Sequence, residues 1–119
     1  MDRHRVVITG IGVVSPIGHG RESFWQACLE GRSGAKRLES SWVRDTGLAT
    51  QIACTLEEFD PVAAGIPKKQ VNLLDRTTWF TLASAEEALV DAGFTLGPSP
   101  DNRHQLRIEG VEPRRISTH

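Results

Sequence analysis

The sequence predicts an α/β fold, and one strand and two helices carry that prediction. Val6-Val-Ile-Thr9 is a short, continuous, β-branched run, which is typical of a strand buried on both faces of a parallel or mixed sheet. Residues 21–30 and 75–92 place apolar side chains three and four residues apart, as amphipathic helices do. A buried strand followed by helices indicates that sheet and helices pack on one another.

Glycines follow the predicted strand at once. Gly10 and Gly12 favour a tight turn out of the strand, because glycine tolerates backbone angles that other residues avoid. Ser15-Pro16 then favours an extended or turn conformation. In the helix predicted over 21–30, Phe24 and Cys28 lie four residues apart on one side, and Gly31 is suited to the helix end.

The middle of the chain has weaker signals. Residues 40–46 show no clear period, whereas residues 48–55 are compatible with a strand. Asp60-Pro61 is suited to start a helix, with Asp as N-cap and Pro at the first helical position, but Pro67 limits that helix to a turn or two.

The strongest helix prediction covers residues 75–92. Apolar residues form one stripe along it, in which we expect Leu82 and Leu89 to be buried. Gly93 ends the helix, and Phe94 can fold back on it as the apolar contact of a Schellman cap. Gly97-Pro-Ser-Pro100 then breaks the pattern, so we expect a segment 1–96 and a loosely ordered polar tail 97–119.

Composition excludes several function classes. The net charge of −1 gives no overall field that favours nucleic acid or an anionic membrane, and no apolar run approaches the length of a membrane span. The apolar run Val6–Ile8 near the N-terminus is too short for a signal peptide, so we expect a cytoplasmic protein. The arginines of the tail are interspersed with acidic residues and are expected to be solvated: Arg103, Arg107, Arg114 and Arg115.

The cysteines and histidines give no sign of a reactive or metal site. Cys28 and Cys54 are too far apart for a CxxC pair, and the four histidines show no metal-ligand spacing with them: His4, His19, His104 and His119. Both cysteines are expected to be buried structural thiols, because a reactive cysteine needs a partner that lowers its pKa. We therefore expect no metal.

Gly10-Ile-Gly12 is a candidate dinucleotide loop that the next residues argue against. The fingerprint requires a third glycine where Ser15 stands, its shorter variant requires glycine at Val14, and Pro16 falls where the phosphate-binding helix should be under way. We expect no cofactor. His19 is expected to be a solvated loop residue, and Trp25 and Trp79 to be core residues rather than ligand platforms.

Several motifs follow one another over about residues 4–94, namely a glycine segment, two helix motifs and isolated pairs: Thr9–Gly18, Phe24-Trp25, Leu29-Glu-Gly-Arg-Ser-Gly34, Phe59-Asp60, Asp75-Arg76 and Ala85–Gly93. In this order they resemble the N-terminal half-domain of the elongating β-ketoacyl-acyl-carrier-protein synthases of fatty-acid and polyketide synthesis. It implies a layered αβαβα fold of the thiolase type, of which this chain would supply an incomplete N-terminal half. It also implies acyl carrier protein as a partner, and a homodimer for the full-length enzyme.

The tail departs from the family pattern. The glycine-rich strand and turn expected after Gly93 are absent, yet Gln105–Gly110 and Pro113–Ser117 look like a stretch found further downstream in the family. An internal deletion accounts for both observations better than a frameshift does.

The family's catalytic motifs are also missing from this sequence. Its nucleophilic cysteine, in an Asp-x-Ala-Cys elbow, and its two later histidines have no counterpart here. We therefore expect no catalytic, cofactor-binding or metal-binding residues, and no condensing activity from this chain alone, although the resemblance implies a decarboxylative Claisen condensation of an acyl thioester with malonyl-carrier protein. Two alternatives remain: a non-catalytic partner of a synthase chain, and a nucleotide-binding oxidoreductase, which Ser15 and Pro16 disfavour.

Overall fold

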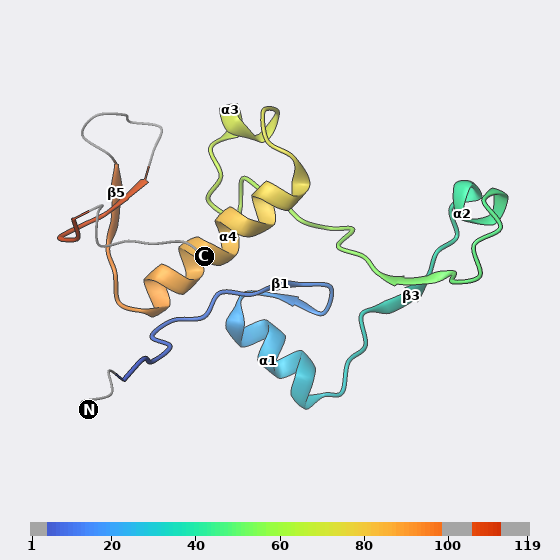
Figure 1. The fold of residues 1–119 in the computed structure, drawn as a ribbon, viewed down its shortest axis with the longest axis horizontal. Coiled ribbons are helices and arrows are strands. Elements are labelled where there is room, and N and C mark those ends of the chain that lie inside the picture. The colour runs from blue at the N-terminus through green and yellow to red at the C-terminus, as the bar shows by residue number, and fades with distance from the viewer. Residues whose placement is uncertain (1–4, 99–105, 113–119) are drawn as a thin grey trace.

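The computed structural model describes residues 5–98 and 106–112. Short strands and four helices alternate along the described chain, with the long helix α4 at the centre (Figure 1). The strands form three separate antiparallel pairs. β1 (Val14–Ser15) pairs with β2 (Gly18–His19), β3 (Ala35–Arg37) with β4 (Ile52–Cys54), and β5 (Leu96–Pro98) with β6 (Leu106–Ile108).

Helix α1 (Arg21–Leu29) forms where the sequence predicts it and ends in a Schellman motif. The amide of Gly31 donates to the carbonyl of Cys28, and the amide of Arg32 donates to the carbonyl of Ala27, 3.0 and 2.9 Å away. Gly31 has a φ of 65°, a left-handed conformation that glycine adopts without steric cost.

The long helix α4 (Arg76–Asp91) is confirmed with both of its predicted ends. Asp75 is the N-cap, and its side chain accepts a hydrogen bond from the amide of Thr78. At the other end, the amides of Gly93 and Phe94 donate to the carbonyls of Val90 and Leu89, which is the Schellman pattern expected from the sequence.

The predicted burial of α4 is wrong. Leu82 is 43% exposed, Leu89 is half-buried, and no described residue of this helix is fully buried. The apolar stripe is present, but the described chain supplies too little apolar surface to cover it.

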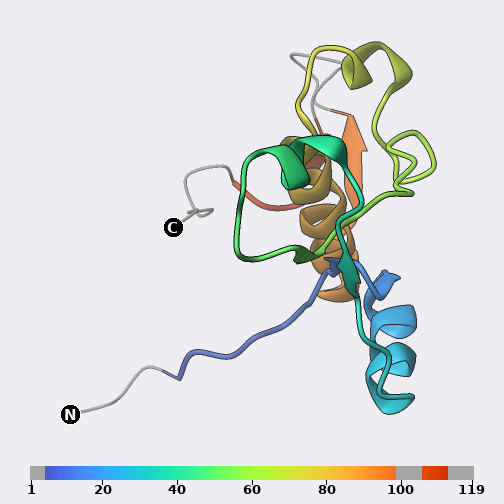
Figure 2. The same cartoon turned by 90° about the vertical axis from the view of Figure 1, so that its right-hand side faces the viewer.

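The predicted buried strand over residues 6–9 does not form. Residues 5–13 are irregular, and Val6, Val7 and Ile8 are 95%, 66% and 85% exposed. A strand needs neighbours to pair its amides and carbonyls, and none of the three strand pairs in the described chain includes this segment. The segment leads away from the rest of the molecule, as Figure 2 shows.

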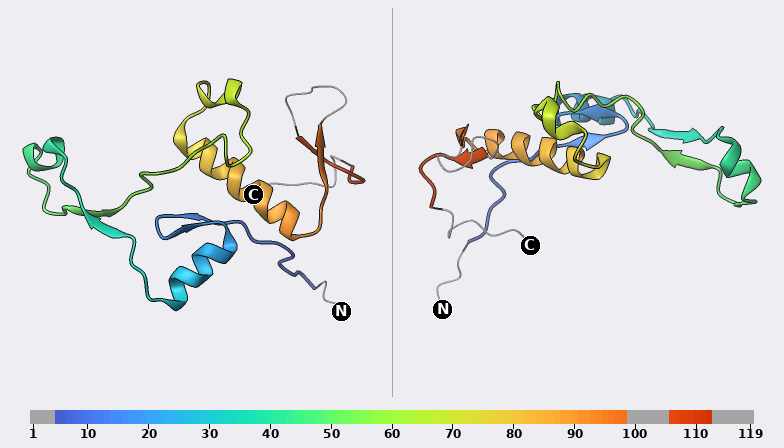
Figure 3. Two further views of the ribbon diagram at one scale, coloured as in Figure 1. Left: turned by 180° about the vertical axis from the view of Figure 1, so that it is seen from behind. Right: turned by 90° about the horizontal axis from the view of Figure 1, so that it is seen from above.

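The middle of the chain partly follows the sequence predictions. β4 lies inside the strand expected over 48–55. Helix α2 (Ser41–Asp45) connects β3 to β4 and lies at the far end of this strand pair (Figure 3). Asp60 caps a turn rather than a helix: its Oδ1 accepts from the amides of Val62 and Ala63, at 2.8 and 3.2 Å. Helix α3 (Lys68–Val71) follows Pro67.

The described part of the chain does not close around one core. Its buried apolar residues in the described part are Ala27, Val43 and Ile66, which belong to α1, α2 and the turn before α3. The accessible surface is 9894 Å², whereas a folded monomer of this mass exposes roughly 6,400 Å². The radius of gyration is 18.3 Å, against roughly 13.5 Å for a compact domain of this length.

The predicted irregular tail includes part of a strand pair. β5 begins one residue before the expected boundary at 96/97 and includes Gly97 and Pro98 of the breaker cluster. Ser99, Pro100 and the residues up to 105, like those from 113 onward, lie outside the described residues. The order of the tail therefore stays a prediction.

Candidate functional site

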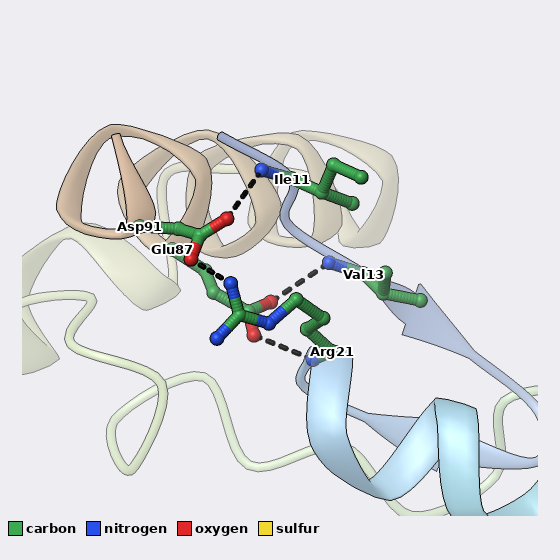
Figure 4. A network of polar contacts seen from close by, with 5 residues as sticks. All are labelled: Ile11, Val13, Arg21, Glu87 and Asp91. Atoms are coloured by element: carbon green, nitrogen blue, oxygen red, sulfur yellow. Dashed lines mark hydrogen bonds and ion pairs between the residues drawn. The ribbon is translucent and has the colours of Figure 1, made fainter. Parts of the chain in front are cut away.

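The best-defined polar network joins the glycine segment 10–13, the start of α1 and the last turns of α4 (Figure 4). Two carboxylates of α4, on Glu87 and Asp91, supply all of its acceptors. Because these residues stand four apart on a helix, their side chains lie on the same side, one turn from each other.

Glu87 uses both of its carboxylate oxygens. Oε2 accepts a hydrogen bond from the amide of Val13 at 2.7 Å, and Oε1 accepts one from the amide of Arg21 at 2.5 Å. Arg21 is the first residue of α1, whose first amides have no partner within the helix. Glu87 therefore caps α1 from another element, and its negative charge lies at the positive end of the helix dipole.

Asp91 also uses both oxygens. Oδ2 accepts from the amide of Ile11 at 3.0 Å, and Oδ1 forms an ion pair with Nη1 of Arg21. The side chain of Asp91 is 21% exposed and that of Arg21 is 51% exposed, so solvent screens this pair only in part.

The glycines of the segment serve close packing rather than a left-handed turn. Neither Gly10 nor Gly12 has a positive φ. A Cβ atom on Gly10 would collide with the carbonyl oxygen of Ala88, and one on Gly12 with the carbonyl oxygen of Ser84. The tight turn predicted for Gly10 and Gly12 does not form, and these glycines instead let the backbone lie directly on α4.

This arrangement argues against a dinucleotide loop. A phosphate would need free amides in the glycine segment, yet those of Ile11 and Val13 already donate to carboxylates. The same carboxylates place negative charge where a phosphate would have to lie. The sequence gives no signal that Glu87 and Asp91 bind a loop, because acidic residues are also usual on the solvated side of a helix.

Both cysteines are exposed, which corrects the prediction of buried thiols. Cys28 lies on the open side of α1, and Cys54 lies at the end of the two-stranded β3–β4 pair, which nothing covers closely enough to bury the thiol. Within the described residues, no imidazole is hydrogen-bonded to either sulfur, so no Cys–His pair of a nucleophilic site is present there.

His19 lies at the end of β2, exposed as the sequence predicted, but with two neighbours. Its Nε2 lies 3.1 Å from the carbonyl oxygen of Glu58, which requires the proton on Nε2, since a carbonyl only accepts. Its ring meets Phe59 edge to face, with centroids 5.4 Å apart. These contacts place His19 as a link between β2 and the segment before α3.

A shallow hollow of about 380 Å³ lies beside His19. Lys36 and Glu57 line it, with Nζ and Oε2 3.7 Å apart, and both side chains are more than half exposed. Thr55 Oγ1 donates to the other oxygen of Glu57 at 3.1 Å. Ser15 and His19 also line the hollow, but the Ser15 hydroxyl donates to the carbonyl of Gly18 at 2.9 Å and not to the imidazole.

The remaining residues singled out in the sequence are two tryptophans, expected in the core, and the arginines and histidines outside the network. Trp25 is 56% exposed, so its assignment to the core is wrong, because nothing in the described chain packs over that side of α1. Trp79 is half-buried, and its Nε1 is buried without a hydrogen-bond partner. Arg107 is exposed on β6, whereas Arg103, Arg114, Arg115, His4, His104 and His119 lie outside the described residues.

Two further classes of site find no support in the described ranges. Residues 5–98 and 106–112 hold no group of three or more His, Cys, Asp or Glu side chains placed to bind a metal ion. In the same part of the chain, no helix combines the length and apolar character that crossing a membrane requires.

Residues 3–107 match the family model described as the β-ketoacyl synthase N-terminal domain. The chain is 40% identical over 94 residues to an oxytetracycline polyketide β-ketoacyl synthase 1 of Streptomyces rimosus, covering 79% of this chain and 21% of the relative. It is 39% identical over 99 residues to 3-oxoacyl-acyl-carrier-protein synthase 2 of Coxiella burnetii, covering 81% and 22%. It is 35% identical over 111 residues to the tetracenomycin ketoacyl synthase alpha subunit of Streptomyces glaucescens, covering 91% and 25%. The chain thus spans about a fifth to a quarter of the length of these relatives.

Proposed function

The chain belongs to the β-ketoacyl synthase family, and we propose that it serves as the N-terminal structural part of a condensing enzyme. The complete enzyme would join an acyl thioester to malonyl-carrier protein by decarboxylative Claisen condensation, in fatty-acid or polyketide synthesis. Its fold would be the layered αβαβα thiolase type, its partner an acyl carrier protein, its assembly a homodimer and its location the cytoplasm.

The observation that carries this proposal is the open surface of a chain that matches an N-terminal domain. Large apolar side chains that an independent domain would bury stay exposed, including Val6, Ile8 and Leu73 at 95%, 85% and 82%. The surface exceeds the roughly 6,400 Å² expected of a folded monomer by about half. Such a surface suits a segment that is completed by further packed structure.

The chain contributes structure rather than the nucleophile. In the Asp-x-Ala-Cys elbow of the family, an aspartate stands three residues before the cysteine. Both cysteines of this chain follow an alanine, but Trp25 and Gln51 occupy the position of the aspartate. Cys28 lies on a helix and Cys54 on a strand, and both are exposed, so neither stands on a strained turn between elements.

A chimera tests this role directly. Residues 3–107 would replace the matching N-terminal segment of the Coxiella burnetii relative, and condensation would be measured with acyl- and malonyl-carrier protein. We expect the chimera to condense and the 119-residue chain alone to show neither stable acylation nor turnover.

A matched chimera carrying Gly12→Ala is the control. It should lose activity, because the new methyl group would collide with the carbonyl of Ser84 and displace the segment from α4. Turnover by the isolated chain, with an acyl group on Cys28 or Cys54, would overturn the proposal. So would a well-folded chimera without activity.

A further inference from the structure

Glu87 and Asp91 together make four contacts with parts of the chain more than sixty residues away in sequence. Three of the contacts are backbone amides, of Ile11, Val13 and Arg21, and the fourth is the guanidinium of Arg21 (Figure 4). In each carboxylate, one oxygen accepts from an amide of the glycine segment 10–13 and the other oxygen binds Arg21 of α1. The two side chains therefore connect three elements, which are the glycine segment, α1 and α4.

Packing alone gives this junction little strength. The glycines bring backbone against backbone, so the contact buries few side-chain atoms, and Ile11 itself is 50% exposed. Val13 is half-buried. The polar contacts are consequently the main attraction that holds segment 10–13 to α4.

The chemistry of the junction requires carboxylates. Both oxygens of each group accept from N–H donors, and an ionised carboxylate offers acceptors only. A carboxamide has a single acceptor oxygen, and its NH₂ would face an N–H donor. A protonated acid likewise turns one of its acceptors into a donor and loses the charge that pairs with Arg21.

We propose that Glu87 and Asp91 form a carboxylate latch that holds the glycine segment and α1 on α4. The charged groups facing the latch are Glu87 and Asp91 from α4 and Arg21 from α1. Within the described residues, the glycine segment presents backbone amides to it.

Amide hydrogen exchange on the full 119-residue chain, resolved by NMR, tests the latch through its three amides. Glu87→Gln should speed the exchange of the Val13 and Arg21 amides about tenfold or more, because both amides lose a charged acceptor and the carboxamide can accept from only one of them. Asp91→Asn should do the same at Ile11. Arg21→Gln removes the ion pair but keeps the amide donors, and should have a smaller effect on all three.

Glu86→Gln is the matched control. It removes the same charge from the neighbouring position of α4, but Glu86 lies against Gly65 and not against the glycine segment. The three amides should exchange as in the wild-type chain, and α4 should keep its helical signals in every variant.

The latch is refuted if the exchange of the three amides is unchanged by both substitutions, if Glu86→Gln speeds it equally, or if the three amides are unprotected in the wild-type chain.

Discussion

The side chain of Asp75 accepts a hydrogen bond from the amide of Thr78 at 2.8 Å, and this contact starts helix α4. It satisfies one of the amides that the first turn leaves without a partner, and it sets a negative charge at the positive end of the helix dipole. The backbone hydrogen bond from Thr78 lowers the pKa of Asp75 below its ordinary value of 3.8.

The lowered pKa of Asp75 predicts an acid-sensitive first turn of α4. A carboxyl group whose pKa is depressed by folding stabilises the folded state above its unfolded pKa, and this contribution disappears as the pH falls through the folded pKa. The loss is therefore expected below pH 3.8, the ordinary value. NMR signals of residues 76–79 should report fraying there.

Two substitutions at Asp75 separate the charge from the hydrogen bond. Asp75→Asn keeps an acceptor, so the first turn should persist at pH 7 while its own acid dependence is removed. Asp75→Ala should fray the turn even at pH 7. An unchanged acid response in Asp75→Asn would show that another group is responsible.

Gly12 and Gly93 should respond differently to the same substitution. Gly12→Ala places a methyl group against the carbonyl of Ser84 and should release residues 10–13 from α4. Gly93→Ala meets no atom within 4 Å but forces alanine into a φ of 82°, which costs about 1–2 kcal/mol at the end of α4.

Amide exchange distinguishes the two glycine effects. The Ile11 and Val13 amides should lose protection in Gly12→Ala and keep it in Gly93→Ala. Similar losses at these amides in both variants would mean that general destabilisation of α4, and not the clash at Gly12, releases the segment.

Buried and exposed apolar residues should differ in their contribution to stability. Ile66 is 4% exposed, so Ile66→Ala should cost about 2–5 kcal/mol in the free energy of unfolding. Leu82 is 43% exposed, and Leu82→Ala should cost about 1 kcal/mol or less. Urea titration followed by circular dichroism gives both values. A larger cost at Leu82 than at Ile66 would place the α4 stripe in a core that the structure does not contain.

Both thiols should react with a disulfide reagent under native conditions. Cys28 and Cys54 are exposed and free, so two equivalents should react at the rate seen in denaturant. Cys28→Ala and Cys54→Ala should each leave one. A thiol that reacts only after unfolding would restore the prediction of burial for that cysteine.

Local signals in the sequence predicted α1 and α4, but not the short helices α2 and α3. Asp75, Gly31 and Gly93 act on backbone groups within one turn, so the ends of α1 and α4 could be read from neighbouring residues. The strand over 6–9 failed because a strand depends on partners elsewhere in the chain.

The latch was beyond sequence reasoning for a related reason. Glu87 and Asp91 fit a solvated helix side as well as a loop-binding one, and only the spatial approach of Ile11 and Val13 distinguishes the two. Cys28 was misplaced because the helical period identifies a shared side of α1 but not whether anything covers it.

The exposed apolar run at residues 6–8 predicts that the isolated chain associates. Val6, Val7 and Ile8 are 95%, 66% and 85% exposed, and an unpaired β-branched segment is a template for pairing with another chain. Sedimentation velocity should show the average mass rising with protein concentration.

Ile8→Lys should suppress this rise, because a charge opposes both apolar contact and strand pairing, while the circular dichroism signal of α4 stays unchanged. Lys69→Ile makes the reverse exchange, from a charged to an apolar residue, at an exposed position of α3, and it should not reduce association. A monodisperse wild-type chain of 13.1 kDa at all concentrations would show that this run does not drive association.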